Sequence, residues 1–246
     1  MADNKNIQLS LFPDDYEEAR KQEIEEQSGK NQIAQKHRFF GLEYCSNALF
    51  CGKYGIPLLN SYTDSIPENY VTFSETTLVG DPYSCVTSYD QDYVIDRMWN
   101  HPDRYVKRLS KYMCFAEPDY SLKVNHPLSV QIANTYRSHA IAYYMQEHGI
   151  KVLPSMAWSS TMSHEFCFDG HSKGGVVMVS TIGTLKDERS RMYFRLGFME
   201  MLKRIAPDAV ILYGDINDKI LSWMPKQLDV HYKEHKRYKR ARNHGK

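Results

Sequence analysis

The chain has 246 residues, 42% of them hydrophobic and 25% charged, which is typical of a globular protein with one large domain or two small ones. Its net charge of +1 favours no particular class of partner. No apolar run is long enough to cross a membrane, and the first residues lack the features of a signal peptide. Five cysteines without a C-x-x-C pair disfavour a disulfide framework or a structural zinc site. We therefore expect a cytoplasmic protein that does not associate with membranes.

The two ends of the chain carry opposite charge. Residues 14–26 are rich in Asp and Glu, whereas residues 231–246 are rich in Lys and Arg. We expect a polar acidic arm over residues 1–36, partly helical or disordered, an α/β domain over residues 37–228, and a basic tail over residues 229–246. Tyrosines interleave with the cations of this tail, which suits DNA or RNA, although a solvated tail is the alternative. The cations expected to contact nucleic acid are Lys236, Arg237, Lys239, Arg240 and Arg242.

The first elements of the domain are irregular. Residues 39–59 are apolar with Gly and Pro punctuation, which indicates irregular packing against a core. The stretch IPENYVTF predicts a proline-marked turn and a short strand at about residues 70–73. Residues 90–112 predict two helices that meet near Asn100, because Pro102 suits the first turn of a second helix.

Strands and helices then alternate. The apolar runs YMCFA, IKVLP, VVMVS and AVILY predict strands, and FCF is a candidate for a further short strand. Between them, residues 126–149 predict a long helix with Pro127 at its start and Gly149 at its end, and residues 185–207 predict another. This alternation predicts a single α/β domain with a largely parallel sheet, either open or an irregular barrel.

Ligands of parallel α/β folds bind beyond the carboxyl ends of the strands. Asp119 follows the first of these strands and Asp215 follows the last. Carboxylates gathered at one edge could hold Mg²⁺ or Mn²⁺, or act as acid and base. The alternative is structural, since Asp at a strand end often caps a helix or holds a turn.

Other candidate residues lie away from the ends of these strands. Arg137 could bind an anion, although such an arginine more often pairs with a neighbouring carboxylate. The run Asp169-Gly170-His171 could place an acid and a base in one loop, but Asp-Gly is first a turn signal. The other histidines, among them His139, are scattered, and the sequence contains no H-E-x-x-H, Walker A, G-x-G-x-x-G or G-x-S-x-G motif.

Residues 90–215 contain a series of recognisable stretches, which are DRMWNHPDRYVKRLSKY, FAEPDYSL, NTYRSHAIAYYMQEHGIKVLPSMAWSS, FCFDGHSKGGVVMVSTIG and GFMEMLKRIAPDAVILYGD. In this order and spacing they resemble a family of phage, prophage and mobile-element proteins, domain of unknown function forty-four seventeen. The family-like core covers about residues 56–220. The resemblance implies a bacterial or phage origin and a cytosolic setting, and it brings no established activity. The chain departs from the family pattern at His171-Ser172-Lys173, where Ile-Pro-Lys or similar is expected.

Three hypotheses of function follow. The first is a nucleic-acid-associated protein of a mobile element, with metal-dependent phosphoryl transfer or nuclease activity. The second is a non-enzymatic protein-interaction or anti-defence factor that engages a host or phage protein. The third is an enzyme acting on a small nucleotide or metabolite. The candidate catalytic residues are Asp119, Asp215 and Asp169, and Asp119 and Asp215 are also the candidate metal ligands. The candidate binding residues are Arg137, Trp158, Tyr120 and Gly183.

Overall fold

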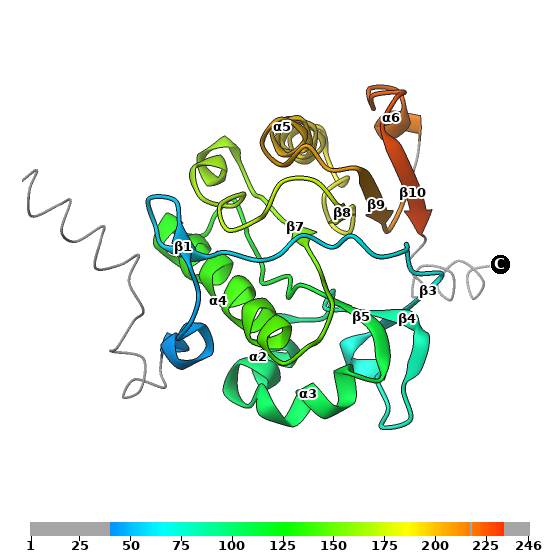
Figure 1. Cartoon of the computed structure of the whole chain (residues 1–246). Helices are drawn as coiled ribbons and strands as arrows, with labels where there is room; N and C mark the ends of the chain where they lie inside the picture. The colour runs from blue at the N-terminus through cyan, green and yellow to red at the C-terminus, as the bar shows by residue number, and fades with distance from the viewer. Residues whose placement is uncertain (1–39, 217, 234–246) are drawn as a thin grey trace, which may run out of the picture.

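A computed structural model describes residues 40–216 and 218–233 (Figure 1). Its strands are β1 (Phe50–Cys51), β2 (Ile56–Pro57), β3 (Asn69–Thr72), β4 (Asp81–Thr87), β5 (Tyr112–Ala116), β6 (Val152–Leu153), β7 (Ser155–Met156), β8 (Val176–Ser180), β9 (Ala209–Tyr213) and β10 (Asp229–Lys233). Its α-helices are α2 (Asp92–Asn100), α3 (Asp103–Leu109), α4 (Leu128–Glu147), α5 (Glu188–Ile205) and α6 (Asp218–Leu221). The short 3₁₀ helices are η3 (Leu42–Cys45), η4 (Phe73–Glu75) and η5 (Thr161–Glu165).

Two parallel four-stranded sheets meet at Pro154. Strands β6 and β7 lie on either side of this proline, and β6 pairs with β5 whereas β7 pairs with β8. The Pro154 carbonyl still accepts the Met178 N–H at 2.8 Å. The sheets therefore form one surface in the order β3-β4-β5-β6/β7-β8-β9-β10. This confirms the predicted α/β domain with a parallel sheet.

Alternate residues of the strands point to opposite faces and into separate cores. Cys114 and Ala116 of β5 lie in one core with Met178 and Ile211. Phe115 instead packs against α2, α3 and α4 on the outer face. On the other half of the molecule, the outer-face residues of β8 and β9 pack against α5. Figure 1 shows the same arrangement, with α2, α3 and α4 beside the half of the sheet that holds β4 and β5, and α5 beside the half that holds β8 and β9.

The sheet is strongly curled. Five strand spacings separate β3 from β9 in the sheet order, which would be roughly 24 Å in a flat sheet. Yet the rings of Tyr70 on β3 and Tyr213 on β9 are 5.7 Å apart. Within the described strands, β3 and β10 do not pair with each other, so the barrel is not closed. The sheet is thus an incomplete barrel, which is intermediate between the two alternatives that the sequence left open, an open sheet and an irregular barrel.

Local sequence sets the ends of the helices that flank the site. Asp187 caps α5, because its carboxylate accepts the Ser190 N–H at 2.8 Å. Helix α4 follows Pro127 and gives way to Gly149, whose φ of +76° is the left-handed conformation that glycine favours. The predicted break between α2 and α3 is confirmed at His101 and Pro102. No described helix combines the length and apolar character that crossing a bilayer requires.

Two parts of the chain differ from the expected elements. The apolar run at residues 166–168 forms turns after η5 instead of a strand. Its apolar character reflects burial of the side chains against α5 and not an extended backbone. Strand β10 occupies the first part of the range expected for the basic tail and pairs in parallel with β9. The remaining tail residues, which include Lys236, Arg237, Lys239, Arg240 and Arg242, lie outside the described residues.

Candidate functional site

The carboxyl edge of the sheet is hollowed by a cavity of about 390 Å³ between the loops that follow β5, β7 and β8. This volume is in the range of small-molecule sites. The described residues that give it chemical character are Asp119, Lys123, Trp158, Ser180, Gly183 and Lys186. We call this cavity the edge pocket. The structure therefore brings together Asp119, Trp158 and Gly183 of the sequence candidates.

Asp119 lies in the loop that leaves β5. Burial, followed in size by the nearby carboxylates of Asp92 and Glu117, raises the pKa of Asp119 to about 7. A carboxyl group with this pKa is present in both protonation states near neutral pH. The loop is held in place because Ser121, two residues later, donates to Asp92 from its backbone N–H at 3.2 Å and from its hydroxyl at 3.0 Å.

Two lysines give the rim of the edge pocket a positive charge. Lys123 and Lys186 are exposed and come from the loops after β5 and β8. In the loop after β8, Gly183 has a φ of +76°, and no atom outside its chain neighbours lies within 4 Å of where a Cβ would be. The backbone there is open toward solvent. A ligand with anionic oxygen atoms would meet positive charge at this rim.

Trp158 forms part of the pocket wall and is itself fixed by α5. Its Nε1–H donates to the Tyr193 carbonyl at 3.1 Å. Gly197 of the same helix leaves the space in which the indole sits, because a Cβ there would lie 2.2 Å from Nε1. The indole also packs on Phe194, with ring centroids 5.6 Å apart. The wall is thus built by packing between the loop after β7 and helix α5.

Arg137 and Tyr120 contact each other and are not among the described residues that line the edge pocket. The Arg137 guanidinium donates to the Asp96 carboxylate and, at 3.0 Å, to the Tyr120 hydroxyl. It also lies over the rings of Tyr120 and Trp99, 4.1 and 4.8 Å from their centroids. These contacts join α4 to α2. The pairing of Arg137 with Asp96 is the alternative to anion binding that the sequence left open. Ligand binding by Arg137 or Tyr120 stays a prediction.

Asp169 and Asp215 belong to other loops than Asp119. Asp215 is exposed beyond β9, and its backbone carbonyl accepts the Thr181 hydroxyl at 2.7 Å. Asp169 lies beside Gly52, where a Cβ would be 1.9 Å from its carboxylate. Neither is among the described residues that line the edge pocket. Catalysis by these two residues, and metal binding by Asp119 with Asp215, stay predictions.

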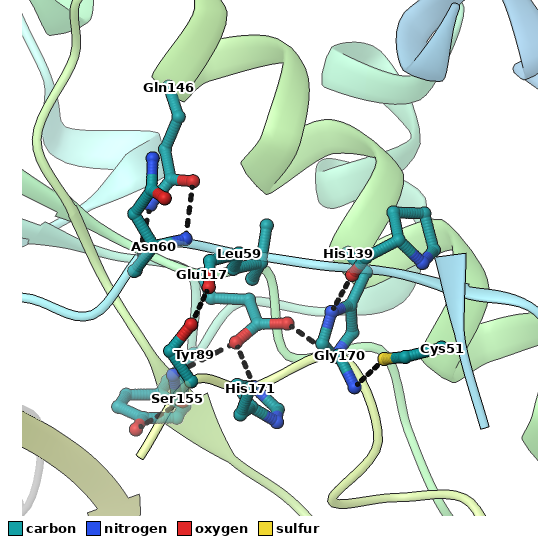
Figure 2. Close-up of polar contacts among 12 residues, drawn as sticks. Cys51, Leu59, Asn60, Tyr89, Glu117, His139, Gln146, Ser155, Gly170 and His171 are labelled. Atoms are coloured by element: carbon teal, nitrogen blue, oxygen red, sulfur yellow. Dashed lines mark hydrogen bonds and ion pairs between the residues drawn. The ribbon is translucent and has the colours of Figure 1, made fainter. Parts of the chain in front are cut away.

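A second polar cluster lies between the sheet and α4 (Figure 2). Glu117 continues the outer face of β5, since its N–H still pairs with the Leu153 carbonyl at 2.9 Å. One of its carboxylate oxygens, Oε2, accepts the Ser155 N–H at 3.1 Å and lies 2.8 Å from Nε2 of His171. The other, Oε1, lies 3.3 Å from Nε2 of His139. We call Glu117, His139 and His171 the Glu–His cluster.

The Glu–His cluster is almost completely removed from solvent. The side chains of all three residues are 1–2% exposed. Burial lowers the pKa of His139 to about 4, although the charge of Glu117 acts in the opposite direction. Burial alone would raise the pKa of Glu117, but the two histidines and the Ser155 N–H outweigh it and hold that pKa below its usual value. The cluster is therefore an anionic carboxylate surrounded by imidazoles.

The model of a family described as "Domain of unknown function (DUF4417)" matches residues 49–231. The chain belongs to this family. The "Gene 1 protein" of Mycobacterium phage L5 is 33% identical over 125 residues, which are 51% of this chain and 55% of that protein. The "Gene 1 protein" of Mycobacterium phage D29 is 33% identical over 123 residues, which are 50% of this chain and 46% of that protein. The chain spans about half the length of these curated relatives, and no solved structure matches it.

The resemblance to a phage-associated DUF4417 family is thereby confirmed. Within this DUF4417 chain, three residues named from the sequence, Asp119, Trp158 and Gly183, line the edge pocket, whereas the Glu–His cluster was not predicted. Glu117 follows a strand and His171 belongs to the noted Asp-Gly-His run, whereas His139 was grouped with the scattered histidines. The available signal was its helical phase, because His139 shares the buried face of α4 with Thr135 and Ala142.

Proposed function

We propose that this phage-associated protein is an enzyme acting on a nucleotide unit, either as a free nucleotide or at the end of a nucleic-acid strand. One observation supports the proposal most strongly. A carboxylic acid, an aromatic wall and two lysines surround a single pocket at the carboxyl edge of a parallel sheet. Phosphate oxygens suit the lysines, and the pocket is large enough for one nucleotide but not for a duplex.

In this proposal the pocket residues divide the work. Lys123 and Lys186 attract the phosphate and neutralise charge that develops on it. Asp119 lies deeper and moves a proton, either from an attacking water or to a leaving oxygen. Trp158 and Met156 provide an apolar surface for the base or sugar. The expected basic tail would add affinity for a strand through its phosphates.

Binding is tested by thermal shift and calorimetry with nucleosides, nucleoside mono-, di- and triphosphates, and 5′-phosphorylated or unphosphorylated oligonucleotides. We expect phosphorylated ligands to raise the Tm and unphosphorylated nucleosides to leave it unchanged. Lys123→Ala and Lys186→Ala should each weaken binding about 10-fold, because each removes one charge-assisted contact. Lys107→Ala, at an exposed position of α3 outside the pocket, is the matched control.

Turnover and strand binding need separate variants. Asp119→Asn should abolish turnover of the bound ligand and change its affinity less than about 10-fold, because it keeps the shape of the side chain. Removing residues 234–246 should weaken strand binding in a salt-dependent way and leave nucleotide binding intact. If no phosphorylated ligand shifts the Tm, the enzymatic proposal fails and the interaction-protein hypothesis takes its place.

A further inference from the structure

His139 has an unusual environment for a buried imidazole. Its Nδ1 lies 3.0 Å from the Pro57 carbonyl, and because a carbonyl only accepts, Nδ1 carries the proton. In the neutral ring Nε2 then bears a lone pair. This atom has no hydrogen-bond partner and lies 3.3 Å from the Glu117 carboxylate. With the neutral ring, two acceptors thus face each other in the interior, which is unfavourable unless a cation lies between them, either a proton on Nε2 or a metal ion.

The surroundings have room for such a cation. Beside the Glu–His cluster is a cavity of about 20 Å³, also lined by Ser138 and Cys167. One water molecule or one ion fits this volume. One ligand atom from each of Glu117, His139 and His171 lies within 4.8 Å of the others. Tetrahedral coordination with bonds of about 2.1 Å separates donor atoms by roughly 3.4 Å, so small side-chain shifts are sufficient.

We propose that Glu117, His139 and His171 bind one divalent first-row transition ion, of the class of Zn²⁺ or Fe²⁺. Two imidazoles and one carboxylate are the donor set that these ions take, whereas Mg²⁺ prefers oxygen ligands alone. The hydrogen bond from His139 Nδ1 to Pro57 is the kind of outer contact that orients a metal-binding histidine. The Ser155 N–H holds the Glu117 carboxylate in the same way.

The proposed ion would connect separate parts of the fold. Glu117 follows β5, His139 lies on α4, and His171 belongs to the loop after η5 that pairs with Leu59. The cavity beside the cluster shares Leu122 and Ala157 with the edge pocket, so the ion would stiffen the floor of that pocket. The proposed metal site depends on the Glu–His cluster alone and would exist whether or not the edge pocket binds a nucleotide.

The test uses full-length protein without a polyhistidine tag. Its metal content is measured by mass spectrometry after purification and again after chelation, and the chelated protein is titrated with Zn²⁺, Co²⁺ and Mg²⁺. We expect one equivalent of Zn²⁺ to bind and raise the Tm, Co²⁺ to give a visible ligand-field absorption at the same stoichiometry, and Mg²⁺ to do neither.

Two variants preserve the local hydrogen bonds and remove one ligand each. Asn at position 139 keeps a donor for the Pro57 carbonyl but has no atom at the place of Nε2, and Gln at position 117 keeps the shape without the charge. His139→Asn and Glu117→Gln should weaken Zn²⁺ binding at least about 100-fold. His148→Asn, at an exposed position just after α4, should bind Zn²⁺ as the parent protein does.

Two results would overturn the proposal. The first is a chelated parent protein whose Tm and absorption do not respond to one equivalent of Zn²⁺ or Co²⁺, which would leave the three residues as a hydrogen-bonded cluster only. The second is undiminished binding in both ligand variants, which would place the ion elsewhere. Because the first result is measured on the parent protein, misfolding of a variant cannot obscure it.

Discussion

At the scale of single residues, the turn that carries His171 depends on Gly170. This glycine has a φ of +82°, and a Cβ there would lie 2.6 Å from both His139 and the Pro57 carbonyl. We expect Gly170→Ala to lower the free energy of unfolding by roughly 2–4 kcal/mol, because backbone strain adds to overpacking. Urea denaturation followed by circular dichroism measures the change.

Gly149→Ala separates the two contributions. Gly149 has a similar φ of +76°, but nothing lies within 4 Å of where its Cβ would be. This variant should cost only about 1 kcal/mol, the price of the backbone conformation alone. Equal losses in the two variants would show that contact with His139 and Pro57 does not matter. The sequence predicts the turn from Asp-Gly, but it cannot reveal this contact, because His139 and Pro57 lie far away along the chain.

The same limit explains which site residues the sequence could supply. Asp119, Trp158 and Gly183 follow strands, and parallel strands end at a common edge, so their proximity could be predicted without coordinates. His139 lies in the middle of a helix, where its role depends on what packs against that face. Its partners Glu117 and His171 come from separate loops, and no spacing rule connects the three.

At the scale of elements, continuous apolar runs were predictable and mixed ones were not. Strands β8 and β9 are buried on both faces and were predicted with the bounds that the structure has. Strand β4 was not predicted because it begins with Asp and Pro, which are depleted in strands, and its pairing with β3 and β5 comes from tertiary context. Strand β10 is a charged edge strand whose composition resembles a tail.

Packing between elements also reverses an ordinary helix preference. Alanine in place of glycine usually stabilises a helix interior by about 1 kcal/mol. At Gly197 of α5, however, a Cβ would lie 2.2 Å from Trp158. We expect Gly197→Ala to destabilise the protein by roughly 1–3 kcal/mol and to weaken ligand binding in the edge pocket, because the indole must move. Denaturant titration and calorimetry measure the two effects.

A double-mutant cycle provides the control for Gly197→Ala. In a Trp158→Ala background the clash is absent, so the same substitution at residue 197 should become neutral or stabilising. A loss of equal size in both backgrounds would contradict the proposed packing between α5 and the pocket wall. The cycle also shows whether the wall of the edge pocket is held by α5 or by its own loop.

At the scale of the whole molecule, the curl of the sheet makes distant strands depend on one another. The Tyr213 side chain on β9 is 3% exposed, and its ring stacks on Tyr89 at 5.1 Å and contacts Tyr70 of β3. We expect Tyr213→Ala to lower the free energy of unfolding by about 3–5 kcal/mol, as for other large buried aromatic residues. The substitution should also speed amide hydrogen exchange in β3, which lies at the opposite end of the strand order from β9 and β10. Tyr83→Ala, at an exposed position of β4, should change the free energy by no more than about 0.5 kcal/mol. If β3 kept its protection in Tyr213→Ala while β9 lost it, the interior of the incomplete barrel would not be the contact that joins the two halves.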